Sequence, residues 1–270
     1  NIIGMLRAFF VLIIILSAFN SIAQMNMDVL HYEHRIELSD QSDTIQGRTI
    51  ITTRIIEPVE KIQIDLKSVD ESGKGMKVSS FQPNLLSSGF TDYSHTDNKI
   101  TIPNKGFYKK GDTILFVIFY SGLPTDGLII SKNKYGKRTF FSDNWPNRAH
   151  NWIPCVDDPA DKATVEFIVT APSHYQVISN GIQIEETNLP DNKKLTHWKE
   201  DVPLPTKVMV IGVADFAVNY VGDVNCIPVS SWVYPENKKD GFYDYAQAKE
   251  ILAWYINYIG PYAYKKLANV

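Results

Sequence analysis

The stretch that decides the fold assignment runs from residue 144 to residue 170 and reads NWPNRAHNWIPCVDDPADKATVEFIVT. It holds two Trp, three Pro and three Asp, together with one of the two Cys of the chain. Its last part, ATVEFIVT from Ala163 to Thr170, alternates apolar and polar residues and therefore predicts a half-buried strand. The residues before that strand form an irregular loop whose side chains need separate interpretation.

Two Trp residues, Trp145 and Trp152, bracket the start of this loop. Large aromatic side chains at such positions pack in the crease between a loop and a sheet. A loop carried on a rigid sheet is also where binding residues collect, and the alternative is that Asn144 or Trp145 faces a ligand. We therefore treat Asn144 and Trp145 as the candidate substrate-binding residues of the chain.

The acidic residues Asp157, Asp158 and Asp161 surround Pro159. Carboxylates at this density can bind a hard cation such as calcium. Asp side chains also accept hydrogen bonds from nearby backbone N–H groups in turns, where Pro restricts φ. The cluster lacks the spaced ligands of a calcium loop, so we predict a structural turn.

The composition describes an ordinary globular protein. The chain has 270 residues, of which 44% are apolar and 21% charged, and its formal net charge is −3. This length allows a real hydrophobic core, and the absence of a basic footprint argues against nucleic acid as a partner. Two Cys are too few for a disulfide scaffold, so Cys155 and Cys226 either pair in an oxidising compartment or are two buried thiols.

The N-terminal 23 residues have the pattern of a secretory signal peptide. Arg7 supplies positive charge, Ala8–Ala18 (AFFVLIIILSA) is a short apolar region, and Ser21-Ile22-Ala23 precedes a cleavage point at Gln24. The apolar region is short for a membrane span. We predict a cleaved signal over residues 1–23 and export to the periplasm or cell exterior, with an uncleaved membrane anchor as the alternative.

Residues 24–225 predict an N-terminal β domain. β-Branched residues dominate 45–56, and 112–120 (DTILFVIFY) is nearly all apolar, as a central strand is. Residues 207–220 (KVMVIGVADFAVNY) predict one long strand that is kinked at Gly212. Many strands without helical patterns between them indicate a mainly β fold, a large antiparallel β-sandwich or saddle.

The pattern changes near residue 226. Residues 227–234 (IPVSSWVY) predict a strand, and apolar residues at helical spacing predict one helix from Asp240 to Ile259, which Gly260-Pro261 ends. One strand and one amphipathic helix cannot bury their apolar faces alone. We therefore expect residues 226–270 to be the start of a second, α-containing domain that is truncated here.

No catalytic or metal-binding motif is recognisable in the sequence, which contains no HExxH, GxSxG, GxxxxGK or GxGxxG. His31 and His34 are three residues apart, a spacing that would suit a helix. In a strand this spacing points the two side chains to opposite faces. We therefore predict no metal site among these residues.

Several ordered motifs resemble those of zinc aminopeptidases of the aminopeptidase N and leukotriene hydrolase type. That family reads PC-x-D-x-P, then K-A and a strand, and this chain matches it at Pro154, Cys155, Asp157, Pro159, Lys162 and Ala163. Three further segments are similar: YSG at 120–122, VISNG at 177–181, and IGPY at 259–262 with Tyr264 and Lys266. The resemblance covers nearly the whole of residues 24–270.

The resemblance implies a saddle-shaped β domain that leads into a thermolysin-like catalytic domain, with peptides as substrates. In the family, the two His of HExxH and a later Glu bind one zinc, and the Glu of HExxH is the general base. A GxMEN motif binds the free amino terminus of the peptide. We expect these motifs beyond residue 270 of the parent protein. The chain by itself is then predicted to bind no zinc, to lack peptidase activity and to dock against the missing catalytic domain.

Two positions depart from the family pattern. His150 stands where the family has Arg, and Arg148 is a candidate substitute. Trp145 stands ten residues before Cys155, where the family often has a Gln or Glu that holds the substrate amino group. The resemblance therefore predicts that this contact is missing or rebuilt, for instance by Asn144, and it gives no side-chain preference.

Two functions remain open on the sequence. The first is an exported zinc aminopeptidase whose substrate cleft is walled by this segment. The second is a non-catalytic β-sandwich module that binds protein or glycan. A GxMEN motif followed by HExxH after residue 270 of the parent protein would support the enzyme, and eroded motifs would support the module.

Overall fold

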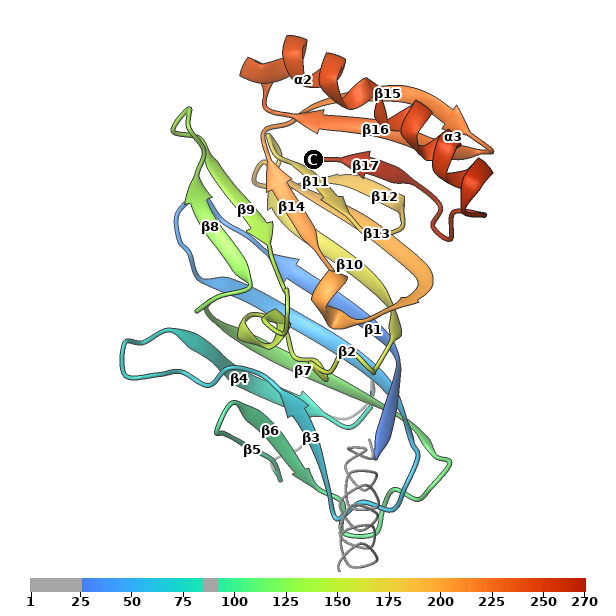
Figure 1. Cartoon of the computed structure of the whole chain (residues 1–270). Helices are drawn as coiled ribbons and strands as arrows, with labels where there is room; N and C mark the ends of the chain where they lie inside the picture. Colours follow the sequence, from blue (N-terminus) through green and yellow to red (C-terminus); the bar gives the residue numbers. More distant parts are fainter. Residues whose placement is uncertain (1–25, 85–91) are drawn as a thin grey trace, which may run out of the picture.

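The computed structural model describes residues 26–84 and 92–270. Strands dominate it, which confirms the mainly β prediction, and Figure 1 shows their arrangement. The signal predicted over residues 1–23 lies outside the described residues. None of the helices in the described ranges is both long and apolar enough to cross a membrane.

The largest sheet has seven strands, and its pairings are antiparallel except that β1 runs parallel to β10. Its order across the sheet is β12 (Ile182–Leu189), β13 (Lys193–Leu204), β10 (Ala163–Pro172), β1 (Met27–Glu37), β2 (Ile45–Ile55), β7 (Thr113–Leu123) and β4 (Gly75–Gln82). β10 is the strand predicted from the alternation in ATVEFIVT, and it lies near the middle of this sheet.

Two smaller sheets complete the β domain, the name used here for β1 to β14. One has the order β11 (Gln176–Ser179), β14 (Ile211–Ala214), β9 (Arg138–Ser142) and β8 (Leu128–Lys132). The other has the order β3 (Lys61–Asp65), β6 (Lys99–Pro103) and β5 (Ser94–Thr96). Side chains from all three sheets form one hydrophobic core, with Tyr32, Phe81, Phe140, Trp152 and Phe167 among the largest fully buried residues.

The remaining elements form a C-terminal unit at the top of Figure 1. Its sheet has the order β15 (Ala217–Val224), β16 (Ile227–Val233) and β17 (Leu267–Asn269), and β17 runs parallel to β16. The short helix η3 (Pro235–Asn237) leads into α2 (Lys238–Ala246), and α3 (Ala248–Tyr258) follows. The described elements of this unit thus include three strands, one of which, β15, precedes residue 226.

The single strand predicted over residues 207–220 was wrong. Thr206–Val208 forms the short helix η2, and the rest is divided between β14 and β15. β14 pairs with β11 and β9, whereas β15 pairs with β16, so the chain must leave one sheet and enter another. The crossing is at Asp215–Phe216, where the Phe216 N–H donates to Oε1 of Gln176 at 2.9 Å.

The single helix predicted over residues 240–259 was also wrong, because the helical segment is broken at Gln247. The apolar periodicity correctly predicts helical structure on both sides of the break. The break allows α2 to pack on β16 while α3 packs on β15. Long-range packing of this kind leaves no mark on local periodicity.

His31 and His34 lie on opposite faces of β1, as predicted. His34 is fully buried, donates to or accepts from Oγ1 of Thr49 through Nδ1 at 2.9 Å, and stacks between Tyr32 and Phe167. Burial lowers the pKa of His34 to about 3, so its ring is neutral at physiological pH. His31 instead faces Glu166 on the outer side of the sheet, with 3.7 Å between Nε2 and Oε1.

Gly47 provides a test of this packing. It pairs with Tyr120 across β2 and β7, and a Cβ atom at Gly47 would lie 2.2 Å from Cζ of Tyr120. We predict that Gly47→Ala lowers the free energy of unfolding by about 1–3 kcal/mol, because the buried tyrosine ring must move. Urea denaturation measures the change. The exposed neighbour Gln46→Ala serves as control and should change stability by less than about 0.5 kcal/mol. Equal stability of both variants would contradict the packing described.

Candidate functional site

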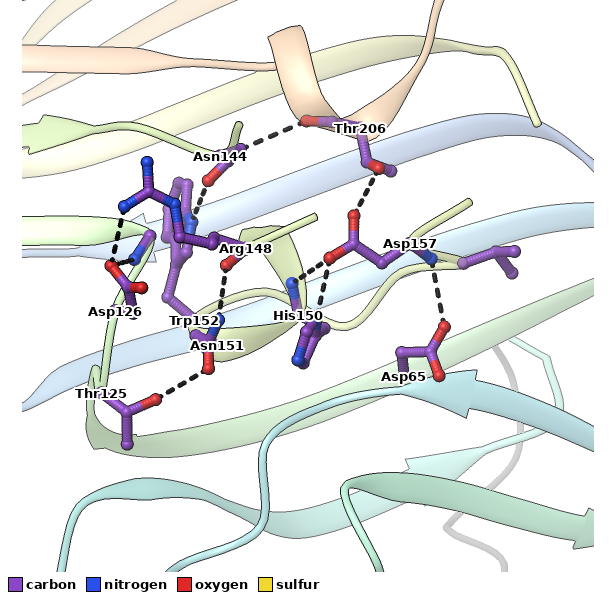
Figure 2. Close-up of polar contacts among 12 residues, drawn as sticks. Asp65, Thr125, Asp126, Asn144, Arg148, His150, Asn151, Trp152, Asp157 and Thr206 are labelled. Carbon is purple, nitrogen blue, oxygen red and sulfur yellow. Dashed lines mark hydrogen bonds and ion pairs between the residues drawn. The ribbon is translucent and has the colours of Figure 1, made fainter. Parts of the chain in front are cut away.

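The loop between β9 and β10 contains every candidate residue chosen from the sequence. It includes the short helix η1 (Ala149–Asn151) and reaches β3, β1 and η2 through polar contacts. Figure 2 shows the contacts of Asp157 with Asp65 in β3 and with Thr206 in η2, together with those of Asn144. We call residues 143–162 the connecting loop.

Asn144 lies inside the protein, with only 1% of its surface exposed. Its Nδ2 donates to the carbonyl oxygen of Met209 at 2.7 Å and to that of Thr206 at 3.3 Å. Its Oδ1 accepts from Nε1 of Trp152 at 2.8 Å. Both polar atoms of the Asn144 side chain are therefore used to join the connecting loop to the segment before β14 and to orient a core tryptophan.

Trp145, the next residue, points outward and is 58% exposed. The Lys207 ammonium lies 4.3 Å from the centroid of its ring, a distance typical of a cation–π contact. Nε of Arg148 donates to the Trp145 carbonyl oxygen at 2.6 Å, which fixes the backbone beneath the ring. Of the two candidates, Trp145 is thus the one that offers an accessible surface.

Asp157 is the centre of the polar contacts in the connecting loop. Its Oδ2 accepts from Nδ1 of His150 at 2.7 Å and from the His150 backbone N–H at 3.2 Å. Its Oδ1 accepts from the Thr206 hydroxyl at 2.7 Å, and its own N–H donates to Oδ2 of Asp65 at 3.1 Å. Burial by itself would raise the pKa of Asp157, but the hydrogen bonds from His150 and Thr206 hold that pKa below its ordinary value.

Arg148 does not take over the contacts of His150. Nη1 of Arg148 approaches Oδ1 of Asp126 at 3.3 Å, and Nη2 pairs with Asp143. His150 pairs with Asp157 on the other side of the short helix. The two basic residues therefore hold different parts of the connecting loop.

The acidic residues after Asp157 form the predicted turn. Oδ1 of Asp158 accepts from the Ala160 N–H at 2.8 Å, and the Asp161 N–H donates to the Asp158 carbonyl oxygen at 3.1 Å. Oδ1 of Asp161 accepts from the Val29 N–H at 3.2 Å, which attaches the turn to β1. These contacts confirm the structural interpretation of the cluster.

The two Cys residues are free and lie in different settings. Cys155 is fully buried, and burial raises the pKa of its thiol well above its ordinary value. Cys226 is exposed, in a left-handed backbone conformation between β15 and β16. They do not form a disulfide, and only Cys155 matches the expectation of a buried thiol.

The described residues do not fit a zinc ion. Across 26–84 and 92–270, no group of three or more His, Cys, Asp or Glu is placed so that it could hold a metal. His150 uses Nδ1 for Asp157, and His34 is enclosed by aromatic rings. No catalytic step through a metal can be derived from these side chains.

A comparison with protein families gives the relationship of the chain. Residues 29–208 match the model of the peptidase M1 N-terminal domain. The chain belongs to this family. The match begins in β1 and ends at η2, so it contains the connecting loop and all three sheets of the β domain except β14.

Curated relatives and solved structures agree with this assignment. Human glutamyl aminopeptidase is 26% identical over 142 residues, which cover 52% of this chain and 15% of the human protein. A probable aminopeptidase 2 of Sulfurisphaera tokodaii is 26% identical over 155 residues, 56% of this chain and 19% of that protein. The chain matches less than a fifth of the length of these relatives.

The fold is shared with an M1 zinc metallopeptidase from Deinococcus radiodurans. The TM-score is 0.72 at 22% sequence identity, and the match covers 93% of this chain and 57% of that structure. The shared fold thus extends past the β domain into the C-terminal unit.

Sequence reasoning missed Asp65, Thr206 and Lys207. Asp65 and Thr206 lie 92 and 49 positions along the chain from their partner Asp157, and Lys207 lies 62 positions from Trp145. No local pattern links them to the connecting loop. Covariation of residue pairs among relatives is the signal that could identify such contacts.

The structure predicts different roles for the two adjacent candidates. Asn144→Ala should lower the free energy of unfolding by roughly 2–4 kcal/mol, because it leaves Nε1 of Trp152 and the Met209 carbonyl oxygen buried without partners. Trp145→Ala should cost less than about 1 kcal/mol, since the ring is mostly exposed. Urea denaturation of both variants measures this difference, and a larger loss for Trp145→Ala would contradict the placement of the two side chains.

Asp161 predicts a pH-dependent stability. Burial, followed by the nearby Asp28 and Asp158, raises the pKa of Asp161 to about 7, against the opposing hydrogen bond from Val29. The folded state therefore keeps a proton that the unfolded state loses above pH about 4, so this carboxyl reduces stability as pH rises from about 4 to 7. Asp161→Asn keeps the acceptor for Val29 and should melt at a higher temperature than the wild type at pH 8.

The difference in melting temperature between Asp161→Asn and wild type should shrink toward pH 5. The control Asp191→Asn changes an exposed turn residue and should follow the wild type at every pH. A wild-type profile that runs parallel to that of Asp161→Asn from pH 5 to pH 8 would contradict the buried, protonated state of this carboxyl.

Proposed function

We propose that the chain is the N-terminal part of an exported zinc aminopeptidase that removes N-terminal residues from peptides. Membership of the peptidase M1 N-terminal domain family carries this proposal. It is supported by the aminopeptidase names of the curated relatives, one from an animal and one from an archaeon. In this proposal the zinc site belongs to a part of the parent protein outside these 270 residues, and the sequence of residues 1–23 directs export.

We propose that the β domain forms one wall of the substrate cleft. The connecting loop is hydrogen-bonded to β1, to β3 and to the segment before β14, so Trp145 stands on a rigid support. One face of its ring is near Lys207, and more than half of the residue is accessible. We propose Trp145 as the contact of this domain with the peptide, while Asn144 fixes the loop from inside.

The choice of an aromatic residue has a chemical consequence. A carboxylate or amide at this position would hold the amino group of a peptide by hydrogen bonds. An indole ring instead offers apolar surface and the negative face of its π-system. Contact with Trp145 therefore favours substrates that place an apolar or cationic side chain against the ring.

Activity measurements test the proposal directly. The polypeptide encoded by the complete gene should hydrolyse aminoacyl p-nitroanilides and contain one equivalent of zinc by atomic emission. The purified 270-residue chain should do neither. Turnover by the 270-residue chain would contradict the assignment of the zinc site, and a folded complete protein without turnover or zinc would support the binding module instead.

The role of Trp145 requires a separate variant of the complete protein. Trp145→Ala should raise KM several-fold for aminoacyl substrates with apolar side chains and leave the zinc content unchanged, because the ring contacts substrate and not the metal. Phe107→Ala is a matched control, since Phe107 is 68% exposed in the turn before β7. An unchanged KM for Trp145→Ala across several substrates would overturn the contact.

A further inference from the structure

Lys266 joins the C-terminal unit to the β domain. It directly precedes β17, and its Nζ donates to the carbonyl oxygen of Ser179, the last residue of β11, at 2.5 Å. The same Nζ lies 4.8 Å from the ring centroid of Trp198 in β13. One amine therefore contacts two strands of the β domain while its backbone leads into the edge strand of the C-terminal sheet.

The surroundings of this amine are short of negative charge. Among the residues that the structure describes, Lys266 forms no ion pair, whereas the neighbouring Lys265 pairs with Asp201 at 2.8 Å on the surface. The buried Glu200 is the acidic group whose charge acts on the pKa of Lys266. One of its carboxylate oxygens already accepts from the Val202 N–H at 2.9 Å. A partly buried ammonium group with a carbonyl oxygen and a ring as partners is only partly compensated for the water it has lost.

We propose that the Lys266 side chain docks β17 on β11 and β13 and that this docking depends on protonation. The docking is tightest after the amine has lost its proton. This inference does not rest on the aminopeptidase assignment. Lys266 also lines a cavity of about 470 Å³ together with Glu200 and Tyr262, and Leu267 and Ala268 of β17 form part of the same wall, so release of β17 would widen the cavity.

The direction of the pH effect follows from proton linkage. Burial lowers the pKa of Lys266 to about 8, although the charge of Glu200 acts in the opposite direction. A lysine on a released, solvated strand has a pKa of about 10.4. Between these two values the released form holds a proton that the docked form has lost, so docking strengthens as pH rises through this window. Below pH about 8 both forms are protonated and docking is insensitive to pH.

The other charged or titratable groups around Lys266 do not reproduce this behaviour. Burial, then the neighbouring Tyr264 and Glu200, raises the pKa of Tyr262, which keeps that phenol neutral in the window. The hydrogen bond from Lys265 lowers the pKa of Asp201, so this carboxylate stays charged. Lys266 is therefore the group whose titration changes β17 docking between pH about 8 and 10.

Lysine ¹³Cε NMR of the full chain tests the lowered pKa of the Lys266 amine. One ε-CH₂ resonance should titrate with a midpoint near pH 8, be shifted upfield by the Trp198 ring and be absent in Lys266→Arg. If every lysine resonance titrates above pH about 9.5, the proposal is overturned.

Hydrogen exchange tests the docking itself. After correction for intrinsic rates, protection of the β17 amides should rise roughly tenfold from pH 7.5 to pH 9.5 in the wild type. Lys266→Met should show no such rise, because it cannot take up a proton, and Lys265→Met should behave like the wild type. A pH-dependent rise that persists in Lys266→Met or disappears in Lys265→Met would overturn the proposal. The NMR titration of the wild type decides the question even if Lys266→Met fails to fold.

Discussion

The buried carboxylate of Asp157 is the constraint on which the arrangement of the β domain depends. Its hydrogen bond with His150 links two parts of the connecting loop, and its hydrogen bond with Thr206 links that loop to η2. The backbone just before it pairs with β3, because Asp65 and Cys155 exchange both N–H to carbonyl hydrogen bonds. The Val156 N–H donates to the hydroxyl of Tyr32 in β1. A single short segment thereby joins β1 and β3, which belong to two different sheets, to η2 before β14.

This constraint explains why two adjacent residues have opposite environments. Once Asp157 and Trp152 are fixed, the start of the connecting loop has to pass close to the segment before β14. Asn144 fills that space with an amide that donates to one carbonyl oxygen and accepts from an indole. The next side chain, Trp145, is then directed outward, where it meets Lys207. The accessible tryptophan is thus a consequence of the internal network, and its support is as rigid as the core beneath it.

The sequence contained the local features of this fold and little of its long-range organisation. The alternation in Ala163–Thr170 predicted β10, and the Asp-Asp-Pro composition predicted the turn, because both depend on neighbours along the chain. The parallel pairing of β1 with β10 joins residues more than 130 positions apart and has no local signature. The division of the predicted strand at Asp215 also has no local signature, because it depends on β14 and β15 pairing with strands of two different sheets. For the candidate site, periodicity cannot show which of Asn144 and Trp145 faces inward in an irregular loop.

Native-state hydrogen exchange measured residue by residue tests the central claim most directly. Loop amides ordinarily exchange through small local openings, far faster than those of core strands. If the connecting loop joins β1, β3 and η2 as described, the amides of Cys155, Val156 and Asp157 should exchange only through global unfolding, with the same free energy as amides in β1 and β10. Exchange of these three amides at the rate of the exposed turn between β8 and β9 would contradict the account.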